Sequence, residues 1–363
     1  MKKSKLSLLI LLLIIFTITS CKNTPELQSQ PGSKPETISN SNISSQLSSQ
    51  PLKLDVSGKD NLWADKKLTV SYISPGASSS WSTVCHNNIK HAAWKWNINL
   101  SFLDGSGKAE LQIEEFKKQL ERNVDAIILS PFYETGWDEL FEKARAKNIP
   151  VILCDRYADC ADESLWTTYI VNDYYKEGEI AGKWLIEYLE KQGKLDEEIR
   201  ILELTGPQKI KAYATQENGY GFREIIKEYE NIEIIDSVDG YFTQAKGYEE
   251  MSNKLQETTD IDVLYCHNDN MAIGAIQAIE EAGLVPGEDI IIVSIMGTDA
   301  ALEAIVEGKI ACSVETNPLL GDLLMEACVR IANGEEIERE IHPVDRVFDI
   351  TNAQEKLDTG YGY

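Results

Sequence analysis

Short runs of β-branched and aliphatic residues alternate with amphipathic stretches along the chain from about residue 67 onward. The first half has runs that we expect to form strands at 68–73, 98–103, 126–129, 151–153 and 169–171. The second half repeats the rhythm, with strands expected at 199–204, 232–238, 263–266, 290–294 and 312–314. Amphipathic stretches such as 108–121 and 137–147 lie between the runs and predict helices. Strands that alternate with helices form parallel sheets, so the pattern predicts an α/β protein with one open sheet in each half.

Polar residues follow several of these expected strands at the point where each strand ends. They are Ser130-Pro131, Asp155-Arg156, Asn172-Asp173, Asn268-Asp269 and Glu315. Any one of them could cap the helix that follows, and for Ser130 or Asn172 taken alone we favour capping. Because ligands bind outside the carboxyl ends of parallel strands, the whole set predicts a binding site between the two halves.

The first residues of the chain have the pattern of an export signal. Lys2, Lys3 and Lys5 precede an apolar run at 6–18 that is shorter than the roughly 20 residues needed to cross a bilayer. Ile18-Thr19-Ser20-Cys21 resembles the bacterial lipobox, whose cysteine carries a diacylglycerol thioether. We therefore expect a lipoprotein signal peptide at 1–20 and lipidation of Cys21, with a plain secretory signal as the alternative. Acyl chains on Cys21 would tether the folded part to the membrane, outside the cytoplasm.

The amino-acid composition predicts a flexible tether near the N-terminus and argues against nucleic acid as a partner. Residues 22–58 are rich in Ser, Asn, Gln, Pro and Thr with almost no aliphatic periodicity, so we expect a flexible tether over 21–66. The chain has 59 acidic and 35 basic residues, and loss of 1–20 with their three lysines changes the net charge from -24 to -27. Such acidity predicts that no nucleic acid is bound through bulk charge.

The motifs of common enzyme and metal sites do not occur in the sequence. His86 and His91 are five residues apart, whereas two metal ligands on one helix face would be four apart. Residues 178–183 only echo a phosphate loop, and we expect their glycines to let a helix pack closely on a sheet. We therefore expect a protein that is not an enzyme and needs no cofactor and no metal. A secreted carbohydrate-active enzyme is an alternative, because carboxylates are abundant.

Six cysteines follow Cys21, at positions 85, 154, 160, 266, 312 and 328. The spacing Cys-x-x-Cys does not occur among them, which argues against a zinc ribbon or a thioredoxin-like site. Cys154 and Cys160 are the only pair close in sequence, and disulfides are allowed outside the cytoplasm. Since Cys154, Cys266 and Cys312 lie in apolar runs, we favour the interpretation that these side chains are small buried hydrophobes.

A series of short motifs follows in order along most of the chain. The series comprises Ser80-Trp81, Asp104-Gly105, 126–131, Thr135-Gly136-Trp137, Asp155-Arg156, Glu177-Gly178, 239–243, 267–269, 274–279, 313–315 and Pro318. In the order and spacing of these motifs, residues 67 to about 346 resemble the type 1 periplasmic sugar-binding proteins of ABC transporters, and most of all their galactofuranose-binding branch.

The resemblance implies a two-lobed fold in which each lobe is a parallel sheet flanked by helices and the chain crosses between the lobes three times. The first lobe would comprise 67–171 and 317–340, and the second 172–316 and 341–363. A monomer would hold one monosaccharide, which could be galactofuranose-like, a pentose or a hexose, and deliver it to an ABC permease. It would work at the outer face of the cytoplasmic membrane or in the periplasm. A sensor that presents its sugar to a membrane kinase or chemoreceptor would have the same fold and is the alternative.

The resemblance also implies which residues meet the sugar. Trp81 would be the apolar platform for the C–H face of the ring, while Asp155 accepts hydrogen bonds from hydroxyls and Arg156 donates to them. The other positions near the sugar are Asp173, Asn218, Asn268, Asp269 and Glu315. The alternatives are a core role for Trp81, a structural ion pair for Asp155 and Arg156, and a hinge role for Glu315.

Three positions depart from the pattern of the galactofuranose-binding branch. Ser82 and Asn218 stand where that branch has arginines, and Met296 stands where it has an aspartate. Asp299 is the alternative source of the missing carboxylate. Because two cations and an acid are replaced, the ligand need not be galactofuranose itself.

Overall fold

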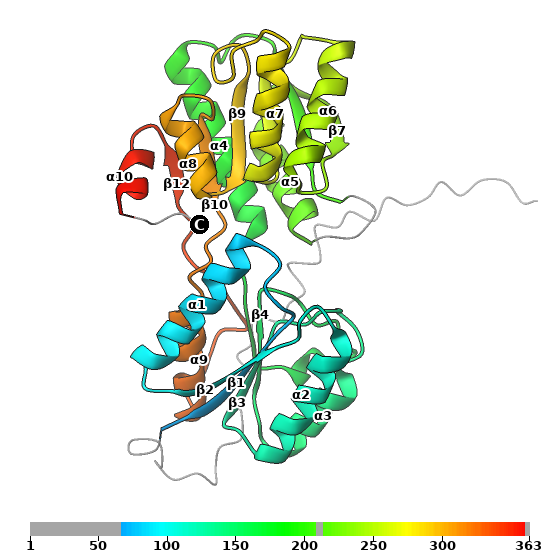
Figure 1. Cartoon of the computed structure of the whole chain (residues 1–363), viewed down its shortest axis with the longest axis vertical. Coiled ribbons are helices and arrows are strands. Elements are labelled where there is room, and N and C mark those ends of the chain that lie inside the picture. The colour runs from blue at the N-terminus through cyan, green and yellow to red at the C-terminus, as the bar shows by residue number, and fades with distance from the viewer. Residues whose placement is uncertain (1–66, 208–212, 360–363) are drawn as a thin grey trace, which may run out of the picture. The chain divides into compact units, whose positions relative to one another are not determined.

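The computed structural model describes residues 67–207 and 213–359, which form two α/β lobes with one six-stranded sheet each (Figure 1). Every strand expected from the sequence is present, and the two-lobed α/β fold is confirmed. The expected signal peptide at 1–20, the lipidation site Cys21 and the tether at 21–66 lie outside the described residues. No helix within the described residues combines the length and apolarity needed to cross a membrane.

The first sheet is parallel throughout and has the strand order β11-β5-β4-β3-β1-β2. Its strands are β1 (Thr69–Ser74), β2 (Asn99–Asp104), β3 (Ala126–Leu129), β4 (Val151–Cys154), β5 (Thr168–Ile170) and β11 (Glu340–Ile341). Its helices are α1 (Ser80–Lys95), α2 (Ala109–Arg122), α3 (Asp138–Ala146) and α9 (Gly321–Ala332), with a 3-10 turn η1 at Glu163–Leu165. The helices α1 and α9 cover one face of this sheet, and α2 and α3 cover the other (Figure 1).

The second sheet has the order β12-β10-β9-β8-β6-β7, and only β12 runs antiparallel to its neighbour. Its strands are β6 (Ile199–Thr205), β7 (Ile232–Asp239), β8 (Val263–Cys266), β9 (Ile291–Met296), β10 (Cys312–Glu315) and β12 (Val347–Asp349). Its helices are α4 (Tyr174–Gln192), α5 (Tyr213–Ile226), α6 (Gln244–Glu257), α7 (Asp269–Glu281), α8 (Asp299–Val306) and α10 (Ala353–Asp358). Core residues of α4 and α5 pack on one face, and those of α6, α7 and α8 on the other.

The apolar strands form because both faces of each sheet are covered by helices. In β3, Ala126 and Ile128 belong to the core on the α1 side, while Ile127 and Leu129 belong to the core on the α2 side. Successive side chains of a strand point to opposite faces, so a strand that is buried on both sides reads as a continuous apolar run. This explains why the hydrophobic pattern alone predicts these strands.

The chain passes between the two sheets three times. It leaves the first sheet after β5 at 171–173, returns after β10 at 316–320, and crosses again between β11 and β12 at 342–346. The strand β11 still belongs to the first sheet at Ile341, which pairs with Ile170.

One residue from each crossing takes part in a group that we call the crossing trio: Asn172, Asn317 and Asp345. The side-chain nitrogen of Asn172 donates hydrogen bonds to Asp345 Oδ1 and to the carbonyl oxygen of Asn317, each at 3.2 Å. The backbone N–H of Asn317 donates to the same Asp345 Oδ1 at 3.2 Å. The trio therefore ties all three crossings together.

The glycines of the phosphate-loop echo at 178–183 lie inside α4, and they pack against α5. A Cβ on Gly178 would come within 2.1 Å of the Asn218 carbonyl oxygen of α5. On the facing helix, a Cβ on Gly221 would come within 1.9 Å of the Tyr175 carbonyl oxygen of α4. The expectation that these glycines bring the helix close to a sheet was wrong, because what they allow is close contact between two helices.

Candidate functional site

Asp155 and Arg156 directly follow β4 on a backbone that is fixed from both sides. Asp155 has a φ of 64°, in the left-handed region that aspartate tolerates better than most residues. Its N–H donates to the Ile170 carbonyl at 2.9 Å, and its carbonyl accepts from the Tyr169 hydroxyl at 2.9 Å. The strand β5 thus sets the direction in which the Asp155 side chain leaves the sheet.

The Asp155 carboxylate and the Arg156 guanidinium form an ion pair that is too long for a hydrogen bond between them. Each group can therefore still hydrogen-bond to a ligand. Arg156 Nε lies 3.9 Å from Asp155 Oδ2, and the arginine side chain is exposed. Burial raises the pKa of Asp155 to about 6, and the positive charge of Arg156 opposes that rise. At neutral pH the pair therefore offers carboxylate acceptors next to a fork of N–H donors, which suits vicinal hydroxyls.

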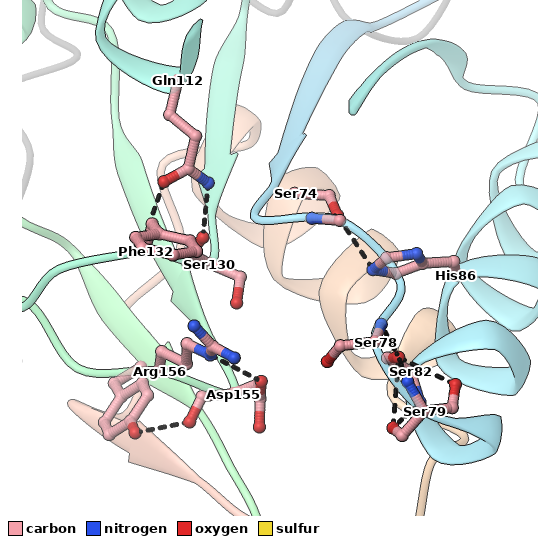
Figure 2. A network of polar contacts seen from close by, with 12 residues as sticks. Ser74, Ser78, Ser79, Ser82, His86, Gln112, Ser130, Phe132, Asp155 and Arg156 are labelled. Atoms are coloured by element: carbon pink, nitrogen blue, oxygen red, sulfur yellow. Dashed lines mark hydrogen bonds and ion pairs between the residues drawn. The ribbon is translucent and has the colours of Figure 1, made fainter. Parts of the chain in front are cut away.

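The loop after β3 lies beside this pair and is held by one buried glutamine. Gln112 of α2 donates from Nε2 to the Ser130 carbonyl at 2.8 Å and accepts from the Phe132 N–H at 2.7 Å. Figure 2 shows Gln112 above this loop, with Ser130 on the same side of the view as Asp155 and Arg156. Helix α3 starts at Asp138, and the residue before it, Trp137, makes no side-chain capping hydrogen bond, so capping was the wrong interpretation for Ser130.

Trp81 lies in the first turn of α1 and is 8% exposed. Its indole N–H donates to the Thr316 carbonyl at 2.8 Å, which links α1 to the second crossing. Its ring also belongs to the core on the α1 side of the first sheet. This position at the edge of the core is compatible both with a core role and with a role as the sugar platform. The platform role stays a prediction.

Ser82 stabilises the first turn of α1, where its side chain makes local hydrogen bonds. Its side chain accepts from the N–H groups of Ser78 and Ser79, each at 3.0 Å, and donates to the Ser79 carbonyl at 2.9 Å (Figure 2). Ser79 and Ser82 together form a capping box. The short serine at this departure from the family pattern thus stabilises the helix end.

Asp173 and Asn172 have separate structural roles at the first crossing. Asp173 caps α4, since its side chain accepts from the Lys176 N–H at 2.9 Å, and it is half-buried. Asn172 belongs to the crossing trio, so capping was the wrong interpretation for this residue. A sugar contact by Asp173 stays a prediction.

Asn268 and Asp269 open α7 after β8. Asn268 accepts from the Met271 N–H and donates to the Phe242 carbonyl, both at 3.0 Å, so its amide fixes a helix cap. Asp269 is fully buried, and its carboxylate accepts from Ser294 Oγ at 2.6 Å, Ser313 Oγ at 2.7 Å and the Thr298 N–H at 2.8 Å. The Thr298 hydroxyl adds a fourth contact at 3.0 Å.

The four donors around Asp269 come from β9, β10 and the cap of α8, so this carboxylate joins three elements inside the second lobe. Burial raises the pKa of Asp269, and the hydrogen bonds oppose that effect. The family pattern placed Asp269 at the sugar, whereas both of its carboxylate oxygens accept hydrogen bonds from protein donors. Its role in binding stays a prediction that these contacts do not favour.

Glu315 ends β10 as a fully buried carboxylate with a bidentate partner. Arg346 Nε donates to Glu315 Oε2 at 2.7 Å, and Arg346 Nη2 donates to Oε1 at 3.0 Å. This pair joins the end of β10 to the third crossing, as expected of a hinge residue. Burial raises the pKa of Glu315, and Arg346 counteracts the rise.

Asn218 lies on α5 with 2% of its surface exposed. Its backbone carbonyl accepts from the Tyr265 hydroxyl at 3.3 Å, but its side-chain Oδ1 has no hydrogen-bond partner among the described residues. A buried amide oxygen without a partner costs free energy, so a ligand hydroxyl that donates to it would be favourable. Among the predicted site residues, Asn218 is therefore one whose buried side-chain oxygen has no hydrogen-bond partner within the described chain.

Glu177 and Asp345 were not among the predicted site residues, and they lie with Asn172 where the crossings meet. Glu177 is fully buried and accepts from the Thr316 hydroxyl at 3.0 Å, and burial raises its pKa well above the ordinary value. The motif Glu177-Gly178 was noted for its family resemblance and could have marked this residue. Asp345 follows no expected strand and gave no signal. Within 67–207 and 213–359, no cluster of His, Cys, Asp and Glu side chains could hold a metal ion.

Comparisons with known proteins match most of this chain. The family described as periplasmic binding protein domain matches residues 70–336. The galactofuranose-binding protein YtfQ of Escherichia coli is 39% identical over 254 residues, which is 69% of this chain and 78% of that protein. The ribose import binding protein of Bacillus subtilis is 27% identical over 76% of this chain and 85% of its own length.

A solved structure extends this likeness to the fold. The arabinose ABC transporter binding protein from Shewanella sp. ANA-3, bound to α- and β-L-arabinofuranose, has a TM-score of 0.70 and 35% identity. The match covers 80% of this chain and 95% of that one.

Proposed function

Because this chain belongs to the periplasmic binding protein domain family, we propose that it captures one monosaccharide and delivers it to an ABC sugar permease. The similar proteins are sugar-binding transport components, and the family works outside the cytoplasm. The observation that carries the proposal is the pair Asp155 and Arg156 at the carboxyl end of β4. The carboxylate and the guanidinium do not hydrogen-bond to each other, so both can bind sugar hydroxyls. Import is favoured over sensing, because relatives carry import and ABC transporter names.

A furanose is the ring form that the proposal favours. One relative is named for galactofuranose and one structure holds arabinofuranose, and both exceed 30% identity to this chain. The departures at Ser82, Asn218 and Met296 remove charged groups, so a sugar with fewer polar contacts than galactofuranose fits them. A pentofuranose such as arabinofuranose has one carbon and one hydroxyl fewer than galactofuranose, and it is our first choice.

The proposed contacts divide between the lobes. Trp81 would pack on the C–H face of the ring, and Asp155 with Arg156 would bind adjacent hydroxyls. From the second lobe, Asn218 Oδ1 would accept from a third hydroxyl, which would satisfy an atom that has no partner among the described residues. Asp173, Asn268 and Glu315 would shape the edge of the site through their caps and ion pair.

The rest of the proposal concerns where the protein works. Residues 1–20 would be removed at export, Cys21 would carry the lipid, and 21–66 would let the folded lobes reach the permease. The lobes would comprise 67–171 with 317–341 and 172–316 with 342–363, one residue later than the sequence suggested, because Ile341 pairs with Ile170 in the first sheet. The protein would act as a monomer without a cofactor, and it would not turn its sugar over.

Thermal shift with a panel of sugars tests this function. The panel contains L-arabinose, D-ribose, D-galactose, D-fructose and methyl furanosides that cannot open to other ring forms. We expect at least one furanose, at a thousandfold excess over its Kd, to raise the unfolding free energy by about 4 kcal/mol and so to raise the Tm. If none does and circular dichroism shows a folded chain, the proposed function is wrong.

Two matched pairs of variants locate the site. Asp155→Asn should abolish the shift, while Asp159→Asn, in the same loop with an exposed side chain, should keep it. Trp81→Ala should abolish the shift, while Trp94→Ala, on the same helix and 77% exposed, should keep it. Loss of the shift in a control variant would mean that the sugar binds elsewhere.

A further inference from the structure

His267 directly follows β8 and is buried, with 3% of its surface exposed. Its ring nitrogen Nε2 lies 2.9 Å from Glu203 Oε1. The other ring nitrogen, Nδ1, is buried as well and has no hydrogen-bond partner among the described residues. One nitrogen of the ring is therefore held by the protein, and the other is not.

Glu203 holds the His267 ring from β6 and is itself held by two other elements. Arg223 of α5 donates from Nη1 to Glu203 Oε1 at 3.0 Å, and its Nη2 donates to Oε2. The Ser237 hydroxyl of β7 donates to the same Oε2 at 2.5 Å. A two-point contact with a guanidinium favours the charged form of a carboxyl group, so Glu203 is a carboxylate whose charge Arg223 balances.

These contacts decide which nitrogen of His267 carries the proton. A carboxylate only accepts hydrogen bonds, so Nε2 must carry a proton to donate to Glu203. Since Arg223 already balances the charge of Glu203, a second buried cation would lack a compensating anion. The neutral ring therefore presents a lone pair at Nδ1, which accepts from an O–H or N–H donor.

His267 lies beside two residues of the proposed sugar site. Asn268 is the next residue in the chain and caps α7. A Cβ on Gly219 would come within 3.3 Å of His267 Cε1, the carbon between the two ring nitrogens, so the ring lies against α5 directly after Asn218. Tyr265, two residues earlier on the same face of the sheet, donates its hydroxyl to the Asn218 carbonyl at 3.3 Å.

This part of the second lobe thus holds two buried acceptor atoms without donors among the described residues, His267 Nδ1 and Asn218 Oδ1. Buried polar atoms in folded proteins are nearly always hydrogen-bonded, and each one that is not costs free energy. A ligand that carries several O–H groups would supply the donors that both atoms lack.

We propose that His267 Nδ1 accepts a hydrogen bond from a sugar hydroxyl and makes the site selective for a neutral polyol. The inference rests on the proposed function, because it adds a contact to the same site. A carboxylate or a phosphate dianion presents lone pairs and no proton, so Nδ1 would disfavour it. Glu203 would be a positioning residue, which fixes the tautomer and the orientation of the ring.

Two substitutions separate binding of the sugar from a structural role. The amide of asparagine is as far from Cβ as Nδ1 is, so His267→Asn keeps an acceptor for the sugar and loses the contact with Glu203. The amide of glutamine is as far from Cβ as Nε2 is, so His267→Gln keeps the donor to Glu203 and loses the acceptor for the sugar. His91→Gln, with an exposed side chain on α1, is the control.

Isothermal titration of the full chain in detergent measures Kd for methyl α-L-arabinofuranoside, methyl β-D-galactofuranoside and the derivatives of each that lack one hydroxyl. We expect removal of one particular hydroxyl to weaken binding to the wild type roughly 10- to 100-fold and to change nothing further in His267→Gln. Removal of the other hydroxyls should weaken both proteins equally. His267→Asn should bind the parent sugar more tightly than His267→Gln, and His91→Gln should match the wild type.

Equal losses in wild type and His267→Gln for every missing hydroxyl would overturn the proposal and would indicate that a water occupies Nδ1. Tight binding by His267→Gln with loss in His267→Asn would also overturn it, because a structural role predicts that order. If another sugar of the panel is the ligand, its own deoxy derivatives are used. Binding without this coupling refutes only the inference, whereas no binding of any sugar by the folded wild type refutes the proposed function as well.

Long-range proton–nitrogen NMR spectra of the wild type give a test that does not depend on the folding of a variant. One of the four histidines should have an unprotonated Nδ1 whose nitrogen signal shifts when the sugar that binds is added. Four histidines whose nitrogen signals all stay unchanged on addition of that sugar would overturn the proposal.

Discussion

Asp345 of the crossing trio should make the protein less stable as the pH rises. The pKa of Asp345 is raised to about 7, mainly by burial and to a smaller extent by the nearby acids Glu315 and Asp173. The hydrogen bonds from Asn317 and Asn172 favour the charged form and oppose that rise. The folded chain thus holds a proton on Asp345 at pH values where the unfolded chain has already released it.

The sign of the effect follows from proton binding. Between pH 3.8, the ordinary pKa of an aspartate, and about pH 7, the folded state binds more protons than the unfolded state. The contribution of Asp345 to the unfolding free energy is fully present below pH 3.8 and is lost as the pH rises through about 7. At about 1.36 kcal/mol per pKa unit, the penalty at pH 8 is at most about 4 kcal/mol.

Asp345→Asn should remove this penalty while keeping the geometry. Asparagine Oδ1 can accept both hydrogen bonds that Asp345 Oδ1 accepts from Asn172 and Asn317. Between pH 5 and pH 8, the wild type should lose about 1–3 kcal/mol of unfolding free energy relative to the variant. Urea unfolding at both pH values measures the difference, and Asp196→Asn, with an exposed side chain, is the control.

The result that would refute this reasoning is a parallel loss of stability in wild type and Asp345→Asn between pH 5 and pH 8. Such a result would mean that Asp345 is already ionised in the folded chain at pH 5. A gain in the control variant equal to that in Asp345→Asn would point to net charge as the cause.

Three further predictions concern the contacts that hold the second lobe and its link to the crossings. Arg346→Ala should cost about 3–5 kcal/mol in urea unfolding because Glu315 stays buried without its partner, and wild-type stability would count against the pair. Gly221→Ala should cost about 1–3 kcal/mol or more, since its Cβ would lie 1.9 Å from the Tyr175 carbonyl; an unchanged Tm would contradict the close helix contact. Asp269→Ala should cost at least about 3 kcal/mol by leaving buried donors unpaired, and a stable variant would refute its joining role.

The sequence was sufficient for the two sheets because their strands are buried on both faces. Such strands read as apolar runs, and the runs alternate with amphipathic helices. The two short strands, Glu340–Ile341 and Val347–Asp349, were not predicted. They have two and three residues, most of them partly exposed, and only pairing with β5 and β10 marks them as strands.

The positions of the candidate site residues at strand ends were predictable from the sequence, and their structural roles were less so. The rule that polar residues follow parallel strands placed Asp155, Asn268 and Glu315 correctly at strand ends. It could not show that Asp269 turns inward, because its donors come from three elements that are distant in sequence. Sequence proximity likewise paired Cys154 with Cys160, while the fold places these two cysteines in cores on opposite faces of the first sheet.

A native mass spectrum tests the central claim most directly. The chain is purified without added sugar and its native mass is recorded. The mass is recorded again after incubation with the furanose panel. The account predicts a single adduct with the mass of one pentose or hexose, which Asp155→Asn loses and Asp159→Asn keeps. A folded chain that gains no sugar mass with any member of the panel, or that gains it equally in Asp155→Asn, would contradict it.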